Sequence, residues 1–283
     1  MKIEIWSDIA CPWCYIGKVR FEKALSAYEH ADDVAVEWRS FQLQPDAPRD
    51  NPVLTAAHLA EKYGVGLSQA HEMMSRVTQV AAEEGLEFRL DKAVAANTFD
   101  AHRLVHHAAS KTMASHGTVA SPAEPATAAA SAAEPAPTAA GADDLGVALM
   151  WRLMHAYQAE GANVADHETL LRLAAEVGLE RGEAASVLAG DAHAADVRAD
   201  LARGRGFGVN GVPFFVIDEQ HGISGAQPSE FFLRALRQLG PKQQQLTMLG
   251  SDGDAGNAGN AGNAGDAGDA AAVCDDDGCA VPR

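Results

Sequence analysis

Polar and apolar residues alternate at the start of the chain. Residues 2–6 (KIEIW) have the period-two pattern of a half-buried β-strand. From Pro12 onward the apolar residues recur at helical spacing instead, at Ile16, Val19 and Leu25. Alternation returns over residues 34–41, so the chain is expected to begin with a β-α-β unit.

The middle of the chain follows a helical period. Between residues 55 and about 205 no stretch has a convincing strand pattern. Ser68 and Asp166 are expected to cap helix starts, and Gly64 and Gly178 to stop helix ends. The predicted helices cover residues 55–63, 68–84, 98–110, 145–160, 167–177, 183–189 and 191–203.

Two stretches lack the large apolar residues that a core requires. Residues 114–142 are mostly Ala with Pro, Ser and Thr, and they predict a disordered linker between two helices. Residues 241–283 form a low-complexity tail that carries Cys274 and Cys279 near its end. A flexible linker of about 34 residues spans roughly 30–35 Å, so the tail thiols could reach the first cysteine pair.

A last ordered block lies before the tail. Residues 214–218 are predicted to form a strand directly after Val212-Pro213, which is unusual because proline cannot donate to a β-ladder. A cis peptide bond at Val212–Pro213 would explain this, because the loop could then present its backbone. Residues 221–225 are expected to pair antiparallel, and a final amphipathic helix is expected to begin near residues 227–230.

The candidate chemistry lies at the junction of the first strand and the first helix. Cys11 and Cys14 frame Pro12 and Trp13 there. Pro12 fits the first helical position, which makes Cys11 the N-cap, beside unpaired N–H groups and the positive end of the helix dipole. A thiolate is stabilised at such a place, so we expect a lowered pKa for Cys11 and an oxidising pair. Cys11 is predicted to attack, and the more enclosed Cys14 to resolve the mixed disulfide.

Other uses of these residues are open from the sequence. A zinc site needs about four ligands, and the second pair, Cys274 and Cys279, lies in the tail. His102 and His106 stand one helical turn apart, as metal ligands can, but no third ligand is evident and a helix-face role is favoured. The sequence therefore predicts no metal.

Composition excludes several classes of function. The 283 residues include 22 basic and 39 acidic ones, for a net charge of −17, which argues against binding to nucleic acid or anionic membranes. The sequence contains no run of 18 apolar residues, so no membrane span is predicted. Glu4 and Asp8 interrupt any signal-peptide core, so a cytoplasmic location is expected. In that reducing compartment the four cysteines favour catalysis or redox sensing over structural disulfides.

These features occur in an order that resembles DsbA-like oxidoreductases, and more closely their FrnE-type branch. The likeness covers about residues 1–113 and 145–240, and it rests on four separated motifs at residues 7–17, 97–103, 211–215 and 224–228. It implies an α/β, thioredoxin-like fold (β-α-β … β-β-α) with a large helical insertion. The implied domains are a thioredoxin-like domain (1–50 and 205–240), a helical insertion (51–204) and the disordered tail (241–283).

The resemblance also implies roles for single residues. Cys11 and Cys14 would form the redox pair. A cis Pro213 would face them and, with Trp13 and Val212, would hold the substrate. Some FrnE-type proteins carry a second C-terminal pair with four residues between its cysteines, a spacing that the accessory pair Cys274 and Cys279 matches. The long 114–142 insertion and the repetitive tail depart from the family pattern.

Three classes of function compete. The favoured one is a protein thiol-disulfide oxidoreductase that needs no cofactor and acts on substrate proteins with thiols or disulfides. The second is a glutathione-dependent isomerase or transferase, similar to 2-hydroxychromene-2-carboxylate isomerase or the kappa-class transferases, with glutathione as co-substrate. Those enzymes need one hydroxyl or thiol at position 11, and Cys14 would be superfluous. The third is a redox-sensing chaperone switched by the tail cysteines. Whether the protein is a monomer or a homodimer is left open.

Overall fold

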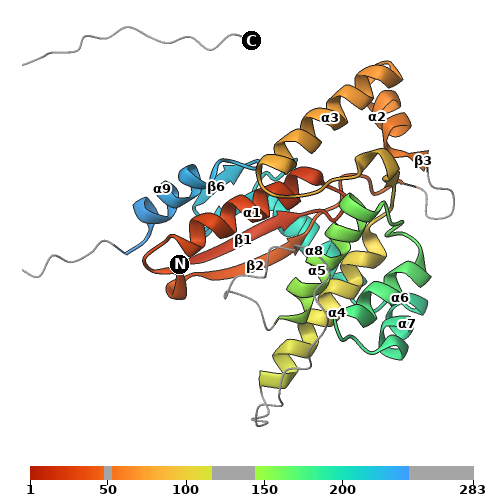
Figure 1. The fold of residues 1–283 in the computed structure, drawn as a ribbon. Helices are drawn as coiled ribbons and strands as arrows, with labels where there is room; N and C mark the ends of the chain where they lie inside the picture. Colours follow the sequence, from red (N-terminus) through yellow and green to blue (C-terminus); the bar gives the residue numbers. More distant parts are fainter. Residues whose placement is uncertain (48–52, 117–143, 242–283) are drawn as a thin grey trace, which may run out of the picture. The chain divides into compact units, whose positions relative to one another are not determined.

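A four-stranded sheet combines two strands from the N-terminal part of the described chain with two from its C-terminal part (Figure 1). The computed structural model describes residues 1–47, 53–116 and 144–241. The strand order is β2-β1-β5-β6, in which β1 runs parallel to β2 and antiparallel to β5, and β5 runs antiparallel to β6. The elements of this sheet and of its connections are β1 (Lys2–Ser7), α1 (Pro12–Ser26), β2 (Ala35–Ser40), β5 (Phe214–Ile217), β6 (His221–Ser224) and α9 (Ser229–Leu239).

Between β2 and β5 the chain is mostly helical, as predicted. Its helices are α2 (Thr55–Tyr63), α3 (Leu67–Glu83), α4 (Phe99–His116), α5 (Leu145–His155), α6 (His167–Glu176), α7 (Arg181–Ala189) and α8 (Ala194–Gly206). The short elements are β3 (Val53–Leu54), β4 (Val94–Ala95), the 3-10 helices η1 (Ala31–Asp33) and η2 (Leu90–Lys92), and one π-helical turn, η3 (Ala156–Glu160).

Several predicted boundaries are wrong. Between residues 55 and 205 the structure has the strand β4, which pairs with β3 over two residues, too few for alternation to show. Ser68 does not cap α3, because the helix already begins at Leu67 with Gly66 as its N-cap. α4 continues to His116, into the predicted linker; residues 117–142 of that linker lie outside the described residues, as does the tail from residue 242.

The caps at the other predicted positions are confirmed. The Asp166 side chain accepts a hydrogen bond from the Thr169 N–H at the start of α6, as an N-cap does. Gly64 and Gly178 both have positive φ, at 64° and 92°, where α2 and α6 end. Glycine adopts this left-handed conformation without the cost that a Cβ would add.

One face of the sheet packs against α1 and α9. Ile3 and Ile5 of β1 meet Phe215 of β5 there, and Phe21 of α1 and Phe232 of α9 close over them. Burying such side chains contributes about 1.5–3 kcal/mol each. The apolar side of α9, which the sequence predicted to be amphipathic, thus packs beside α1 in the layer that covers this face of the sheet.

The other face of β1 is buried too, which corrects the prediction of a half-buried strand. α8 covers it: Trp6 Nε1 donates to the Asp200 carbonyl at 2.9 Å. Glu4 is buried on this face because Arg203 and Arg39 pair with it, at 2.6 and 2.7 Å. Hydrogen bonding to Arg203, and then to Arg39, lowers the pKa of Glu4 although burial opposes this. A polar residue in the pattern therefore marks a buried ion pair here, not a solvent-facing position.

The helices of the insertion share a core with the start of α1. Leu104, Leu149 and Leu170 from α4, α5 and α6 belong to one apolar cluster that also includes Cys11 and Cys14. Contacts group Met1–Lys242 into one unit. The division of this unit into a thioredoxin-like domain and a helical insertion stays a prediction. Among the described helices, none combines the length and apolar character needed to cross a bilayer.

Candidate active site

The turn between β1 and α1 places Cys11 as predicted. Cys11 is the N-cap of α1 and Pro12 its first helical residue. The Cys11 N–H donates to the Asp8 carbonyl at 3.0 Å, and the Cys14 N–H donates to the Cys11 carbonyl at 3.1 Å. The Cys11 side chain makes no capping bond; its thiol donates to the Val212 carbonyl at 3.5 Å. That bond belongs to the protonated sulfur, because a thiolate has no hydrogen to donate.

The two cysteines differ in burial and in whether they line a pocket. Both are free thiols, and Cys14 is slightly the more enclosed, at 1% exposed against 3% for Cys11. Burial raises the pKa of Cys14, and its hydrogen bond and charge interaction with Cys11 raise it further, while Ser7 and the Asp8 backbone act in the opposite direction. Cys11 lines a pocket that Cys14 does not reach. An incoming sulfur therefore meets Cys11 first.

The loop before β5 faces Cys11. The Val212–Pro213 peptide bond is cis, as predicted from the sequence. Gly17 of α1 makes room for the proline ring: a Cβ at this position would lie 2.9 Å from Pro213 Cγ and 3.4 Å from Ala226 Cβ. Gly225, which has a φ of 80°, donates its N–H to the Pro213 carbonyl at 2.9 Å. The motif at residues 224–228 thus secures the proline loop.

An apolar pocket of about 210 Å³ opens beside Cys11. The turn between β1 and α1, together with α2 and α3, supplies most of its wall, with Leu59 and Met74 among the apolar side chains and Lys62 as a cation. Trp13 and Tyr63 also line it, and both are strongly exposed, at 39% and 54%. Trp13, which we predicted to bind substrate, therefore stands where a polypeptide could contact it.

The turn after α5 contributes two more residues to this pocket. Tyr157 and Gln158 lie in η3, the π-helical turn after α5. The Tyr157 hydroxyl donates to the Val94 carbonyl at 2.8 Å, and Gln158 Nε2 donates to the Ile9 carbonyl at 3.4 Å. Burial raises the pKa of Tyr157 to about 12, although a hydrogen bond with Thr55 lowers it, and the nearby Asp8 and Cys11 add to the rise. π-turns occur often at functional sites, but helical spacing does not reveal them.

The motif at residues 97–103 is mainly structural. Asn97 Nδ2 donates to the carbonyls of Pro45 and Ala47 and so holds the loop after β2. Arg103, paired with Asp100, donates to backbone carbonyls in the last turn of α7 and in the link from α7 to α8. His102, which was predicted to be a helix-face residue, lies with its Nε2 3.5 Å from Asp8 Oδ1.

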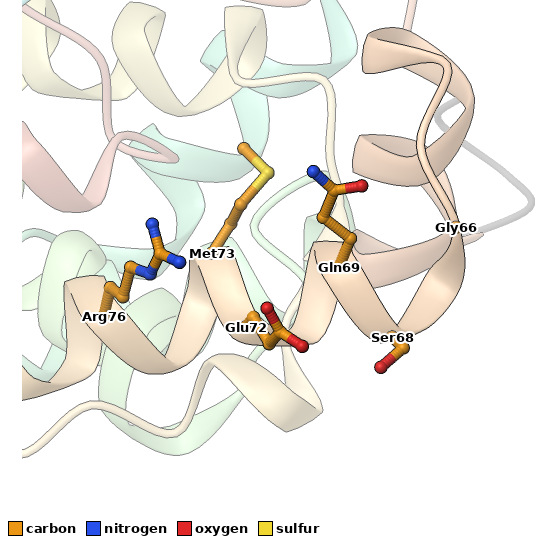
Figure 2. Close-up of a pocket in the computed structure, with 6 residues that line it drawn as sticks. All are labelled: Gly66, Ser68, Gln69, Glu72, Met73 and Arg76. Atoms are coloured by element: carbon orange, nitrogen blue, oxygen red, sulfur yellow. The ribbon is translucent and has the colours of Figure 1, made fainter.

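A second hollow lies on α3 (Figure 2). Figure 2 shows that all six lining residues come from α3 and the residue before it. They are Gly66, Ser68, Gln69, Glu72, Met73 and Arg76. Only Met73 also lines the pocket beside Cys11. The residues that line this hollow include no cysteine, unlike those of the pocket beside Cys11.

The remaining predicted site residues lie elsewhere. Cys274 and Cys279 fall outside the described residues. Within the described part of the chain, no cluster of three or more His, Cys, Asp or Glu side chains is arranged to hold a metal ion. His106 does not join His102 as a ligand pair, because it contacts Asp200 and Ser40 instead.

The fold and the site together define a class: thioredoxin-fold proteins with a Cys-x-x-Cys turn at the first helix and a cis-proline loop facing it. The family model of the DSBA-like thioredoxin domain matches residues 2–122 and 119–237, and the chain belongs to this family. Most of the described chain is covered by these two matches.

Individual relatives agree with this placement. The chain is similar to the crystal structure of probable DsbA oxidoreductase SCO1869 from Streptomyces coelicolor, at 39% identity and a TM-score of 0.70, covering 84% of this chain and 89% of that one. It is 32% identical over 94 residues to the uncharacterized protein YwbO of Bacillus subtilis (strain 168), covering 29% of this chain and 45% of YwbO's length.

Two more distant structures share the fold. Cytosolic disulfide reductase DsbM from Pseudomonas aeruginosa has 19% identity and a TM-score of 0.53, covering 84% of this chain and 98% of that one. 2-Hydroxychromene-2-carboxylate isomerase has 16% identity and a TM-score of 0.50, covering 83% of this chain and 93% of that one. Identities this low report the fold and leave the chemistry to be argued from the site.

Proposed function

We propose that the protein is a thiol-disulfide oxidoreductase that acts through Cys11 and Cys14. The observation that carries the proposal is the position of Cys11. It stands at the N-terminus of α1, bonded to the Val212 carbonyl beside cis Pro213, and lines the pocket while Cys14 does not. A second thiol three residues further along has a use in disulfide exchange, since it can displace the group that is bound to the first thiol.

The reaction is a pair of sulfur exchanges. When the enzyme reduces, the Cys11 thiolate attacks a substrate disulfide, forms a mixed disulfide and releases one substrate sulfur as a thiolate, which takes up a proton. Cys14 then loses its proton and attacks Cys11, so that the second substrate thiol leaves and the enzyme pair ends as a disulfide. Oxidation of a substrate dithiol runs the same steps in reverse, and no organic cofactor enters.

The proposed substrates are polypeptides with thiols or disulfides. An extended chain could lie along residues 211–213, with Val212 and Pro213 presenting backbone to it. The exposed rings of Trp13 and Tyr63 offer apolar contacts at the pocket rim. The four motifs favour the FrnE-type branch and a cytoplasmic setting, where thiols are kept reduced; both are part of the proposal.

Substitution of each cysteine tests the proposal. Cys11→Ser should abolish reduction of insulin disulfides. Cys14→Ser should accumulate a mixed disulfide between Cys11 and substrate, visible as a band on a non-reducing gel, because the resolving sulfur is missing. Full activity in the double variant would refute the assignment, since no described cysteine would then remain to carry the exchange.

The apolar pocket favours one alternative, a glutathione-dependent isomerase or transferase. Its wall of Leu59, Met74 and Val77 could accept the aromatic body of a small substrate. In such an enzyme glutathione would be the co-substrate, and Cys14 would be dispensable. Turnover of an aromatic substrate with glutathione by Cys14→Ser, at the wild-type rate, would favour this alternative over disulfide exchange.

A further inference from the structure

The hairpin of α2 and α3 supplies one wall of the pocket beside Cys11. Leu59 and Tyr63 are among its residues there, and the two helices lie side by side (Figure 1). The buried side chains of these helices are few and mostly small: Ala56, Ala70, Met74 and Ala81. A segment with few buried apolar contacts is held weakly, so the position of this wall depends on polar contacts as well.

A polar anchor lies at the C-terminal end of α3. Glu84, the C-cap of this helix, accepts hydrogen bonds from Arg20 Nε at 2.7 Å and from Lys23 Nζ at 2.6 Å, one on each carboxylate oxygen. Arg20 and Glu84 are each 15% exposed, whereas Lys23 is half exposed. An ion pair shielded from solvent is stronger than one on the surface, so Arg20 is the main partner. Burial raises the pKa of Glu84, but the hydrogen bonds from Lys23 and then Arg20 outweigh it and lower the pKa.

Arg20 also reaches the residues that secure the cis-proline loop. Its Nη1 donates to the Ala226 carbonyl at 2.8 Å. Ala226 follows Gly225, whose N–H holds the Pro213 carbonyl at 2.9 Å. A guanidinium presents its donors in a fixed planar fork, so the two groups that it binds keep a fixed separation. One side chain of α1 therefore joins the end of α3 to the loop that carries the cis-proline.

We infer that Arg20 is a positioning residue that sets the separation between the α2–α3 hairpin and the cis-proline loop, and that it thereby serves the binding of polypeptide substrates. This inference rests on the proposed function, because it concerns recognition at the same cysteine pair. A polypeptide that lies along the loop and places a side chain in the pocket touches both elements, so its binding depends on their separation. A small disulfide needs only access to Cys11, and the bond from Gly225 to Pro213 does not involve Arg20. Loss of Arg20 should therefore weaken the binding of polypeptides and spare the exchange chemistry.

Single-turnover oxidation of the enzyme tests the role of Arg20. The full chain is reduced, freed of reductant and mixed with increasing concentrations of insulin or of 2-hydroxyethyl disulfide, so that the enzyme dithiol becomes a disulfide and the substrate disulfide becomes two thiols. Acid quenching, alkylation and peptide-resolved mass spectrometry report Cys11 and Cys14 separately from the tail cysteines. The variants are Arg20→Gln and Arg20→Lys. Lys23→Gln is the matched control, because Lys23 binds the same carboxylate from the same helix, while the Ala226 carbonyl accepts from Arg20.

Arg20→Gln is expected to raise the half-saturation concentration for insulin by about five- to tenfold, because the bound polypeptide would then have to order the hairpin itself. The limiting rate with insulin and the rate constant with 2-hydroxyethyl disulfide should stay within about twofold of wild type, as for a lost binding contact. Arg20→Lys keeps the charge but has no planar fork, so its effect on insulin should have the same direction and a smaller size. Lys23→Gln should behave as wild type with both disulfides, because an exposed ion pair contributes little.

Three results would overturn the inference: an insulin half-saturation concentration unchanged by Arg20→Gln, equal losses with the two disulfides, or an equal loss with insulin in Lys23→Gln. Equal losses with the two disulfides would indicate a general disturbance of the fold. If Arg20→Gln does not fold, Arg20→Lys against Lys23→Gln decides, since only the former should weaken the binding of insulin. Failure of the proposed function is a different result, because neither disulfide would then oxidise the wild-type pair of Cys11 and Cys14.

Discussion

Gly17→Ala is the substitution whose effect can be worked out most directly from the structure. The new Cβ would lie 2.9 Å from Pro213 Cγ and 3.4 Å from Ala226 Cβ. Carbon atoms pack best at about 3.5–4.0 Å, so Pro213 would have to move by roughly 0.6–1 Å away from α1. A displacement of about 1 Å at a site that positions reacting groups can cost about 10²-fold in rate. We therefore expect a roughly 10- to 100-fold loss in kcat/KM.

The stability of the fold should change much less. Alanine is favoured over glycine by about 1 kcal/mol inside a helix, and this offsets part of the roughly 1–3 kcal/mol that overpacking costs. The assay is insulin reduction, with the melting temperature followed by circular dichroism. Gly206→Ala is the matched control, because it lies in α8 with nothing within 4 Å of its Cβ. Wild-type activity in Gly17→Ala would refute the view that contact between α1 and the cis-proline loop matters for catalysis.

Two further predictions concern the sheet and the tail. Glu4→Gln should lower the free energy of unfolding at pH 7 by about 2 kcal/mol, because Arg203 and Arg39 lose a buried partner. The pKa of Glu4 is lowered in the folded state, so the difference from wild type should hold above pH 4.5 and shrink as the pH falls below it, which urea titrations at several pH values would measure. A difference that grew in acid would contradict the ion-pair reasoning. Replacing Cys274 and Cys279 with serine should slow reoxidation of the reduced enzyme in a stopped-flow assay without lowering its melting temperature; unchanged kinetics would mean that the tail pair takes no part.

The turn between β1 and α1 could be predicted because short-range rules determine it. Proline at the first helical position and the spacing of the cysteines fix where α1 begins, without reference to the rest of the chain. Pro213 was recognisable for a similar reason, since a proline that enters a strand has few conformations open to it. These features depend on neighbours in sequence, and they are also the ones that define the family.

The surroundings of the turn could not be predicted in the same way. Alternation assigned Glu4 to a solvent-facing side of β1, but α8 covers that side and Arg203 neutralises the charge. Tyr157 and Gln158 reach the pocket through a π-helical turn, whose extra residue rotates side chains away from the face that a period of 3.6 assigns to them. Such contacts depend on how distant elements pack, and a local pattern carries no record of that packing.

His102 shows most clearly where local reasoning ends. It shares one helix face with His106, and the spacing treats the two alike. In the structure, however, His102 meets Asp8 under the redox pair and His106 meets Asp200 beside the sheet.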